Sequence, residues 1–135
     1  MDGPLFTFIH PVLCLEAEIR FPSPIRGVDS YGRAYIQGHV EVLHNNIYGS
    51  ICDDEFDNED ATVLCKMFDS GRYGIGTYSS SYKQSNIGAT KIWLDNLSCN
   101  GSEHHISQCR HNGWGINNCG KSERVGIRCT GGMCY

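Results

Sequence analysis

The chain has 135 residues and a formal net charge of −4, and its 11 lysines and arginines are scattered along the sequence. A nucleic-acid-binding face needs clustered basic residues, and a membrane-spanning helix needs about twenty consecutive apolar residues, so composition and charge exclude both. A domain of this length buries about two-thirds of its unfolded surface, which leaves a modest apolar core.

Cysteine is the most unusual feature of the composition, since eight cysteines occur beside 16 glycines. An even number of cysteines in a small chain is typical of an oxidising compartment, where disulfide bonds supplement a small core. Structural zinc sites need cysteine pairs separated by two to four residues, and the only close pair here is Cys129 and Cys134. Disulfides are therefore favoured over zinc. The cysteines are Cys14, Cys52, Cys65, Cys99, Cys109, Cys119, Cys129 and Cys134.

The N-terminal residues 1–17 have two interpretations. The segment Pro4 to Leu15 is largely apolar and fits a secretory signal peptide that is cleaved after Ala17. Asp2 lies where a signal peptide carries positive charge, and Pro11 interrupts the apolar run, which favours an N-terminal extension instead. Both interpretations stay open at this point.

The choice between them decides how two terminal cysteines pair. Removal of a signal peptide takes Cys14 with it and leaves seven cysteines, so that Cys134 is free or forms a disulfide-linked dimer. Retention of the N-terminus allows Cys14 and Cys134 to form a clasp between the two ends of the chain.

The first predicted elements are an extended segment and a β-hairpin. Pro22 and Pro24 favour extended backbone, because proline fixes its own φ and keeps the preceding residue out of the helical region. From Gly38 the residues alternate as in a β-strand, Asn45-Asn46 supplies a turn that tolerates positive φ, and Ile47–Cys52 is the second strand.

A helix has the clearest local signal. Asp57 precedes Asn58-Glu59-Asp60, so its side chain is predicted to cap the helix, with acidic residues in the first turn. The pattern ends at Gly71 and places Cys65 on the buried face, which predicts a disulfide half rather than a nucleophile. The apolar positions at helical spacing are Ala61, Leu64, Cys65 and Phe68.

The remaining elements have weaker signals. Residues 72–90 are rich in Gly, Ser and Tyr without a period, and we expect a long surface loop. Ile92–Leu94 is predicted to be a short buried strand and Val125–Cys129 the final strand. Between them, Ser102 is expected to cap a helical turn that runs to Cys109.

Eight segments of the chain carry a family resemblance. They are Gly38–Val42, Ile51–Asp54, Phe56-Asp57, Ala61–Cys65, Ile92–Asn96, Gln108–Gly115, Asn118-Cys119 and Val125–Ile127. In this order they resemble the signature of scavenger receptor cysteine-rich (SRCR) domains over most of residues 25–129, which leaves 130–135 as a short tail. The resemblance implies an α+β fold, in which a curved antiparallel sheet cradles the helix of Asp57 to Phe68 and disulfides staple the domain.

The resemblance also implies a disulfide pairing, which spacing alone cannot choose among about a hundred alternatives. Ile36 and Ser70 occupy the places of an extra cysteine pair in one subgroup, so the chain resembles the six-cysteine subgroup with two additional terminal cysteines. In the chain-entropy account, the Cys52–Cys119 bond contributes roughly 4 kcal/mol to the stability of the fold, so we expect reduction to unfold the domain. The implied bonds are Cys52 to Cys119, Cys65 to Cys129 and Cys99 to Cys109.

Three acidic residues are the candidate metal ligands. Asp53 and Asp54 are adjacent carboxylates that repel each other unless a cation intervenes, and Ca²⁺ or Mg²⁺ takes such oxygen ligands. The resemblance to SRCR domains adds Glu123 as a third ligand. Arg124 stands where SRCR relatives commonly have Asp, which removes one carboxylate. The alternative is that Arg124 or Lys121 pairs with the aspartates as solvated ion pairs.

Two asparagines are candidate N-glycosylation sites. Asn96 and Asn100 each begin an Asn-x-Ser motif, which suits loops of a secreted protein. Asp95 and Asn96 are otherwise interpreted as turn formers after a buried strand.

The histidines and tryptophans are interpreted as structural or exposed residues. His104 and His105 are sequence neighbours that diverge on a short turn, so with His111 they are exposed polar residues rather than a transition-metal site. Trp93 and Trp114 are expected to anchor the core and a loop.

No catalytic arrangement is predicted. The sequence lacks a Gly-x-Ser-x-Gly elbow and a His-Glu-x-x-His helix, and Asp53 and Asp54 share one loop instead of facing each other across a cleft. The chain is therefore interpreted as a binding module rather than an enzyme.

The leading hypothesis is an extracellular domain, secreted or on the outer face of a membrane protein. It is expected to recognise polyanionic or protein ligands through Asp53, Asp54 and Glu123, with a divalent cation bridging to the ligand. The alternative is an accessory or matrix-interaction module of a secreted multidomain enzyme, either lysyl-oxidase-like or a protease.

Overall fold

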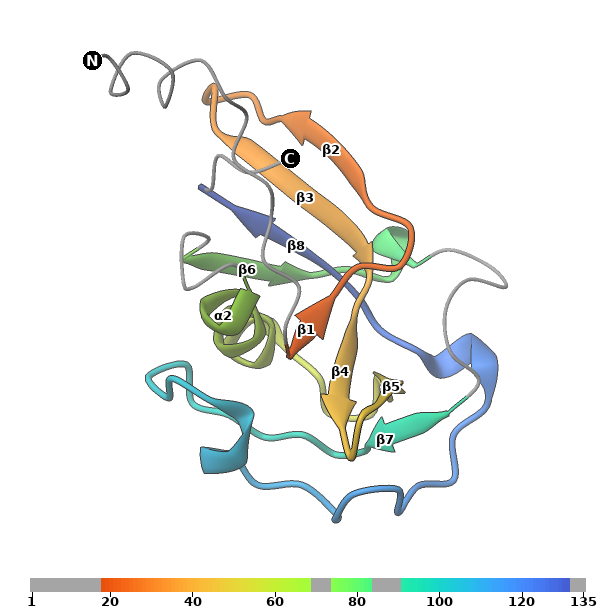
Figure 1. The fold of residues 1–135 in the computed structure, drawn as a ribbon. Helices are drawn as coiled ribbons and strands as arrows, with labels where there is room; N and C mark the ends of the chain where they lie inside the picture. Colours follow the sequence, from red (N-terminus) through yellow and green to blue (C-terminus); the bar gives the residue numbers. More distant parts are fainter. Residues whose placement is uncertain (1–17, 69–73, 84–90, 132–135) are drawn as a thin grey trace, which may run out of the picture.

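The computed structural model describes residues 18–68, 74–83 and 91–131, which contain two four-stranded sheets and one α-helix. The elements are β1 (Ile19–Arg20), β2 (Ile25–Val28), β3 (Ala34–His39), β4 (Glu41–His44), β5 (Ile47–Ile51), α2 (Asn58–Met67), β6 (Ile75–Tyr78), β7 (Ile92–Leu94) and β8 (Gly126–Thr130). The first sheet has the order β1-β4-β5-β7 and the second has β2-β3-β8-β6. Helix α2 packs beside β6 and β8, and a long segment between β7 and β8 runs around the lower end of the molecule (Figure 1).

The predicted α+β class is confirmed, but the strands form two sheets rather than one, and β5 pairs with β7 in parallel. The β4–β5 hairpin is confirmed as well. Its turn residues have φ values of 50° at Asn45 and 62° at Asn46, which is the left-handed region that asparagine tolerates.

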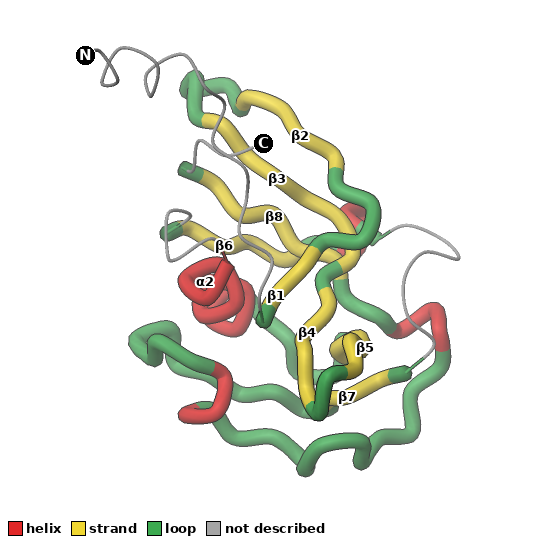
Figure 2. The backbone as a smooth tube through the Cα atoms, viewed as in Figure 1, coloured by secondary structure: helices red, strands yellow, loops and turns green. Residues whose placement is uncertain are grey.

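The strand predicted from Gly38 does not alternate between a buried and an exposed face. His39, Val40, Glu41 and Val42 are all buried. The chain leaves one sheet at His39 and joins the other at Glu41, so both of its faces are covered (Figure 2). The fully buried Glu41 accepts a hydrogen bond of 2.8 Å from Arg20 Nε, and the Arg20 guanidinium lies over the ring of Tyr48.

The predicted cap of α2 is confirmed. The backbone N–H of Asp60 donates to Asp57 Oδ1 at 3.1 Å, and the backbone N–H of Asp57 donates to Asp60 Oδ2 at 2.9 Å. This reciprocal pair satisfies two donors that a helix N-terminus leaves without partners. The helix ends with Phe68 as its C-cap, and Gly71 lies outside the described residues.

The surface loop predicted for residues 72–90 is wrong in its described part, which contains β6 and the 3₁₀ helix Ser80–Tyr82. Gly76 explains the error, because its sequence neighbours favour a loop, whereas the structure places it where β6 touches α2. A Cβ on Gly76 would overlap the carbonyl group of Ala61 and lie 2.5 Å from the Thr62 nitrogen. Glycine therefore permits this close packing of strand on helix.

The core reaches further towards the N-terminus than residue 25. Ile19 and Phe21 are both buried, β1 pairs with β4, and the ring of Phe21 meets that of Phe68 edge-to-face with centroids 5.0 Å apart. Residues 1–17 and 132–135, with Cys14 and Cys134, lie outside the described residues.

Three disulfides tie these elements together, with the pairing that the family resemblance implies. Cys65 to Cys129 joins α2 to β8, Cys52 to Cys119 joins the end of β5 to the long C-terminal segment, and Cys99 to Cys109 closes a loop within that segment. The Cys52–Cys119 and Cys99–Cys109 bonds thus hold the segment between β7 and β8, which has little regular structure, while Cys65–Cys129 fixes the helix to the second sheet.

Candidate functional site

The acidic residues gather at one edge of the first sheet. Strands β5 and β7 are parallel neighbours, so the residues that follow them leave the sheet at the same edge. Cys52, Asp53 and Asp54 follow β5, and Asp95 follows β7. The backbone N–H of Cys52 donates to the Leu94 carbonyl at 2.8 Å, and this hydrogen bond holds the segments that follow β5 and β7 side by side.

The 3₁₀ helix Lys121–Glu123 (η4) brings the third predicted ligand to this edge. The backbone N–H of Asp53 donates to the Glu123 carbonyl at 2.7 Å, and the Cys52–Cys119 disulfide lies beside them. Asp53, Asp54 and Glu123 each contribute a carboxylate oxygen to a group whose atoms all lie within 4.8 Å of one another. The structure therefore assembles the three residues that the sequence and the resemblance suggest as metal ligands.

Asp54 is the centre of this negative charge. Its Oδ2 lies 3.6 Å from Cys52 Sγ and 3.8 Å from Cys119 Sγ, and these disulfide sulfurs carry no proton to donate. Burial raises the pKa of the Asp54 carboxyl, and the neighbouring charges of Asp95, Glu123 and Asp53 raise it further. No basic side chain of the described ranges forms an ion pair with Asp54. Its charge is therefore poorly compensated.

Asp53, in contrast, has a basic partner. Lys83 Nζ lies 2.6 Å from Asp53 Oδ2, with both side chains 22% exposed, and the same ammonium donates to the Ser122 carbonyl at 3.0 Å. Arg124 or Lys121 is the solvated partner that the sequence predicts. Arg124 is instead only 3% exposed, and its Nε donates to the Lys121 carbonyl at 3.0 Å.

Asp95 is the site residue that sequence reasoning missed, because it was assigned to a turn. Its side chain is 3% exposed, and its Oδ1 has no hydrogen-bond partner among the described residues. One of its carboxylate oxygens lies within 4.8 Å of one from Asp54. A buried carboxylate oxygen without a partner is costly, which makes Asp95 Oδ1 a candidate ligand atom for a cation or a water molecule.

An open pocket of about 310 Å³ adjoins these two aspartates. Its wall is polar, and the amide of Asn117 is already engaged, since Nδ2 donates to the Ile92 carbonyl and Oδ1 accepts from the Cys119 N–H. The lining residues are Asp54, Asp95, Asn96, Asn112, Ile116, Asn117 and Asn118. Carboxylate and amide oxygens with room for water are the ligands that Ca²⁺ and Mg²⁺ take.

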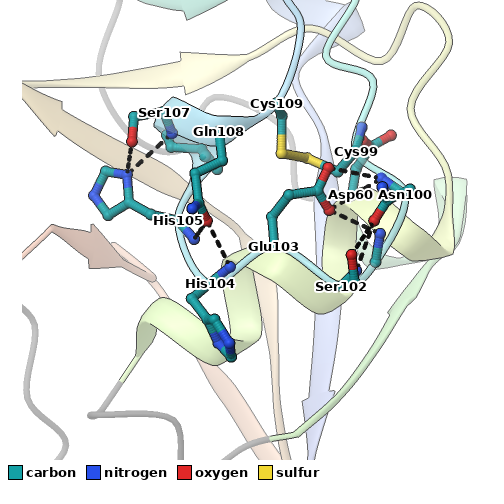
Figure 3. The surroundings of a disulfide bond; sticks show 12 residues. Asp60, Cys99, Asn100, Ser102, Glu103, His104, His105, Ser107, Gln108 and Cys109 are labelled. Carbon is teal, nitrogen blue, oxygen red and sulfur yellow. Dashed lines mark hydrogen bonds between the residues drawn. A yellow bond between two sulfur atoms is a disulfide. The ribbon is translucent and has the colours of Figure 1, made fainter.

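Among the described residues, the groups of three or more potential metal-ligating side chains contain no histidine. His105, rather than the predicted Ser102, caps the 3₁₀ helix Ile106–Gln108. Its Nε2 lies 2.9 Å from Glu18 Oε2, so this side chain ties the N-terminal side of the domain to the C-terminal segment. Ser102 instead donates its backbone N–H and its hydroxyl to Asn100 Oδ1, at 2.9 and 2.6 Å (Figure 3).

The two predicted glycosylation sites differ in exposure. Asn100, which directly follows Cys99, is exposed, whereas Asn96 is half-buried at the wall of the pocket with a φ of 54°. The positive φ agrees with the turn role predicted for Asn96.

The predicted aromatic anchors occupy one cluster. Trp93 is buried and donates its indole N–H to the Ile47 carbonyl at 2.8 Å, while Trp114 packs against the core and stacks on the imidazole of His44 with centroids 4.0 Å apart. Both tryptophans therefore hold the long C-terminal segment against the first sheet.

None of the helices in the described part of the chain is long and apolar enough to span a membrane. The family described as "Scavenger receptor cysteine-rich domain" matches residues 30–130.

Among curated proteins, macrophage receptor MARCO of Mus musculus is 44% identical over 94 residues, which is 70% of this chain and 17% of that protein. Lysyl oxidase homolog 4 of Bos taurus is 43% identical over 94 residues, which is 70% of this chain and 12% of that protein. The match thus spans less than a fifth of these relatives' own length.

Two solved structures share the fold. The dimeric form of the SRCR domain of mouse MARCO has a TM-score of 0.62 and 35% identity, and covers 94% of this chain and 99% of its own. The third SRCR domain of murine neurotrypsin has a TM-score of 0.57 and 27% identity, and covers 79% of this chain and 96% of its own. With its disulfide pairing and its acidic edge, the chain belongs to the scavenger receptor cysteine-rich domain family.

Proposed function

We propose that this domain is an extracellular binding module that recognises polyanionic or protein ligands through a divalent cation. The cation is held by the acidic cluster, which consists of Asp53, Asp54, Asp95 and Glu123. Anionic groups of the ligand complete its coordination.

The buried Oδ1 of Asp95 is the observation that supports this proposal most strongly. It lacks a hydrogen-bond partner among the described residues while a carboxylate oxygen of Asp54 lies nearby. Calcium–oxygen distances are about 2.3–2.6 Å, so two oxygens on either side of one ion are up to about 5 Å apart. The spacing of at most 4.8 Å is compatible with a shared ion.

Charge explains why the ligand needs the cation. The chain has a net charge of −4, and the acidic cluster concentrates negative charge at one edge. A polyanion is repelled by such a surface when no cation is present. A bound divalent ion offsets part of this charge and presents open coordination positions to sulfate, phosphate or carboxylate oxygens.

Binding to an immobilised sulfated polysaccharide tests the proposal. We expect Ca²⁺-dependent binding that a chelator abolishes and that Asp54→Asn weakens at least about tenfold, because Asp54 belongs to both carboxylate groups. Glu59→Gln is the matched control, since it removes one charge from an exposed position in the first turn of α2. Polysaccharide binding that persists unchanged in chelator would contradict the proposal.

The second candidate function is a non-catalytic accessory or matrix-interaction module within a secreted enzyme. The 43% identity to lysyl oxidase homolog 4 of Bos taurus favours it. An accessory module that only orients a neighbouring domain needs no cation, so Ca²⁺ titration of the isolated domain distinguishes the two functions.

Secretion is part of the same proposal. Three disulfides among the described residues and the exposed Asn100 sequon suit an oxidising, glycosylating compartment. One matched structure is a dimeric form of its domain, and a bond between two copies of Cys134 remains our proposal for this chain. The intact mass of secreted, unreduced protein measures cleavage, glycan occupancy and interchain bonding together.

A further inference from the structure

We propose that Lys83 is a tethered competitor of the divalent cation, one that occupies the Asp53 side of the acidic cluster and thereby sets its cation affinity. This inference rests on the proposed function, because it concerns how the same site is regulated. Its chemistry is the competition of an ammonium group and a metal ion for the same carboxylate oxygens.

The geometry gives Lys83 a metal-like position. Its Nζ lies 2.6 Å from Asp53 Oδ2 and 3.0 Å from the Ser122 carbonyl, so it bridges the loop after β5 and the helix η4, which carries Glu123. A cation bound by Asp53 and Glu123 would bridge the same two elements. Lys83 is the C-cap of the 3₁₀ helix Ser80–Tyr82, and it lies 30 residues from Asp53 and 39 residues from Ser122 in the sequence.

The two halves of the cluster differ in charge balance. Asp53 is paired with Lys83, whereas Asp54 and Asp95 have no ion pair with the described residues. The Asp95 Oδ1 is also without a hydrogen-bond partner there. The Asp54–Asp95 half is therefore open to a cation while Lys83 stays in place. Recruitment of Asp53 Oδ2 as a further ligand requires the ammonium to leave that oxygen.

This competition predicts that removal of the ammonium tightens cation binding. Lys83→Met keeps most of the apolar stem, and Lys83→Gln keeps a group able to donate to Asp53 and Ser122. Both free one carboxylate charge and remove one nearby positive charge. Calcium affinity measured by isothermal titration calorimetry should rise about tenfold in both variants, whereas Lys83→Arg should bind as weakly as the wild type.

Lys121→Met is the matched control. Lys121 is exposed on η4 near the cluster, and its side chain makes no ion pair with the described carboxylates. Its loss should change calcium affinity less than about threefold. An equal gain in Lys121→Met and Lys83→Met would assign the effect to net charge and overturn the inference.

A merely structural role of Lys83 predicts the opposite sign. If the bridge only holds η4 in place, Lys83→Met and Lys83→Gln lower calcium affinity or leave it unchanged, and the inference is wrong while the cation site stands. If neither the wild type nor any Lys83 variant binds calcium, the proposed function itself fails. Lys83→Gln keeps the test decisive should Lys83→Met not fold.

Discussion

At the scale of single residues, Asp60 connects the helix to the Cys99–Cys109 loop. Its Oδ1 accepts the backbone N–H of Cys99 at 2.6 Å (Figure 3). Its Oδ2 accepts the backbone N–H of Asp57 at 2.9 Å. The loop is held further by Lys66 Nζ, which donates to the Gly101 carbonyl at 2.7 Å. A fully buried carboxyl thus orders the loop that carries the exposed Asn100.

Burial raises the pKa of Asp60 from 3.8 to about 7. The folded state therefore keeps the proton that the unfolded state has lost, and the stabilisation is present at low pH and lost as pH rises through about 7. We expect Asp60→Asn to lose stability at every pH, because its amide replaces an acceptor by a donor. The free energy of unfolding of the variant should also lack the decline that Asp60 causes in the wild type between pH 5 and pH 8.

Urea unfolding at pH 5 and pH 8 measures this effect. The decline in the free energy of unfolding between the two pH values should be larger in the wild type than in Asp60→Asn, by on the order of 1 kcal/mol. The subtraction matters because burial lowers the pKa of His39 and of His111, and these groups favour folding at higher pH instead. Parallel pH profiles for the two proteins would show that Asp60 does not titrate in this range.

The candidate site was only partly predictable from the amino-acid sequence. Asp53 and Asp54 are adjacent in sequence, and Glu123 came from the family resemblance. Asp95 and Lys83 approach them only because β5 pairs with β7 in parallel and because Ser80–Tyr82 forms a short helix. Neither contact has a local signal, since both depend on tertiary packing.

At the scale of elements, the features that depend on residues close together in the sequence were predictable. The Asn45-Asn46 turn and the Asp57 cap act within a few residues, and both are found as expected. Strand β6 has no such signal, because its central glycine is selected by the backbone of α2 rather than by its own neighbours. The passage of the chain from one sheet to the other at Val40 also has no local signal, because it depends on tertiary packing.

Gly76→Ala tests the contact between β6 and α2. The added methyl group would overlap the backbone at Ala61 and Thr62, which cannot move without distorting the helix. We expect a loss of about 3 kcal/mol or more in the free energy of unfolding, measured by urea titration.

Gly74→Ala is the matched control, since a Cβ there has no heavy atom within 4 Å. Its free energy of unfolding should stay within about 0.5 kcal/mol of the wild type. Equal stability of the two variants would mean that β6 does not pack on α2 as described.

At the scale of the whole molecule, two small sheets meet around one core, and covalent bonds hold the long C-terminal segment to it. The Cys52–Cys119 disulfide lies directly beside Asp54, so the bond that stabilises this segment also helps to position the acidic cluster. Fold and candidate site therefore depend on the same cross-link. That coupling explains how a small domain keeps several carboxylates close together without a large apolar interior.

The central claim is that the acidic cluster holds a divalent cation at the oxygen atoms of Asp54 and Asp95. A crystal structure of the protein grown with calcium tests it most directly, through the anomalous signal of the ion. We expect a calcium peak within about 2.3–2.6 Å of Asp95 Oδ1 and of an Asp54 carboxylate oxygen. A water molecule hydrogen-bonded to Asp95 Oδ1 in saturating calcium, with no anomalous peak at the cluster, would contradict the claim.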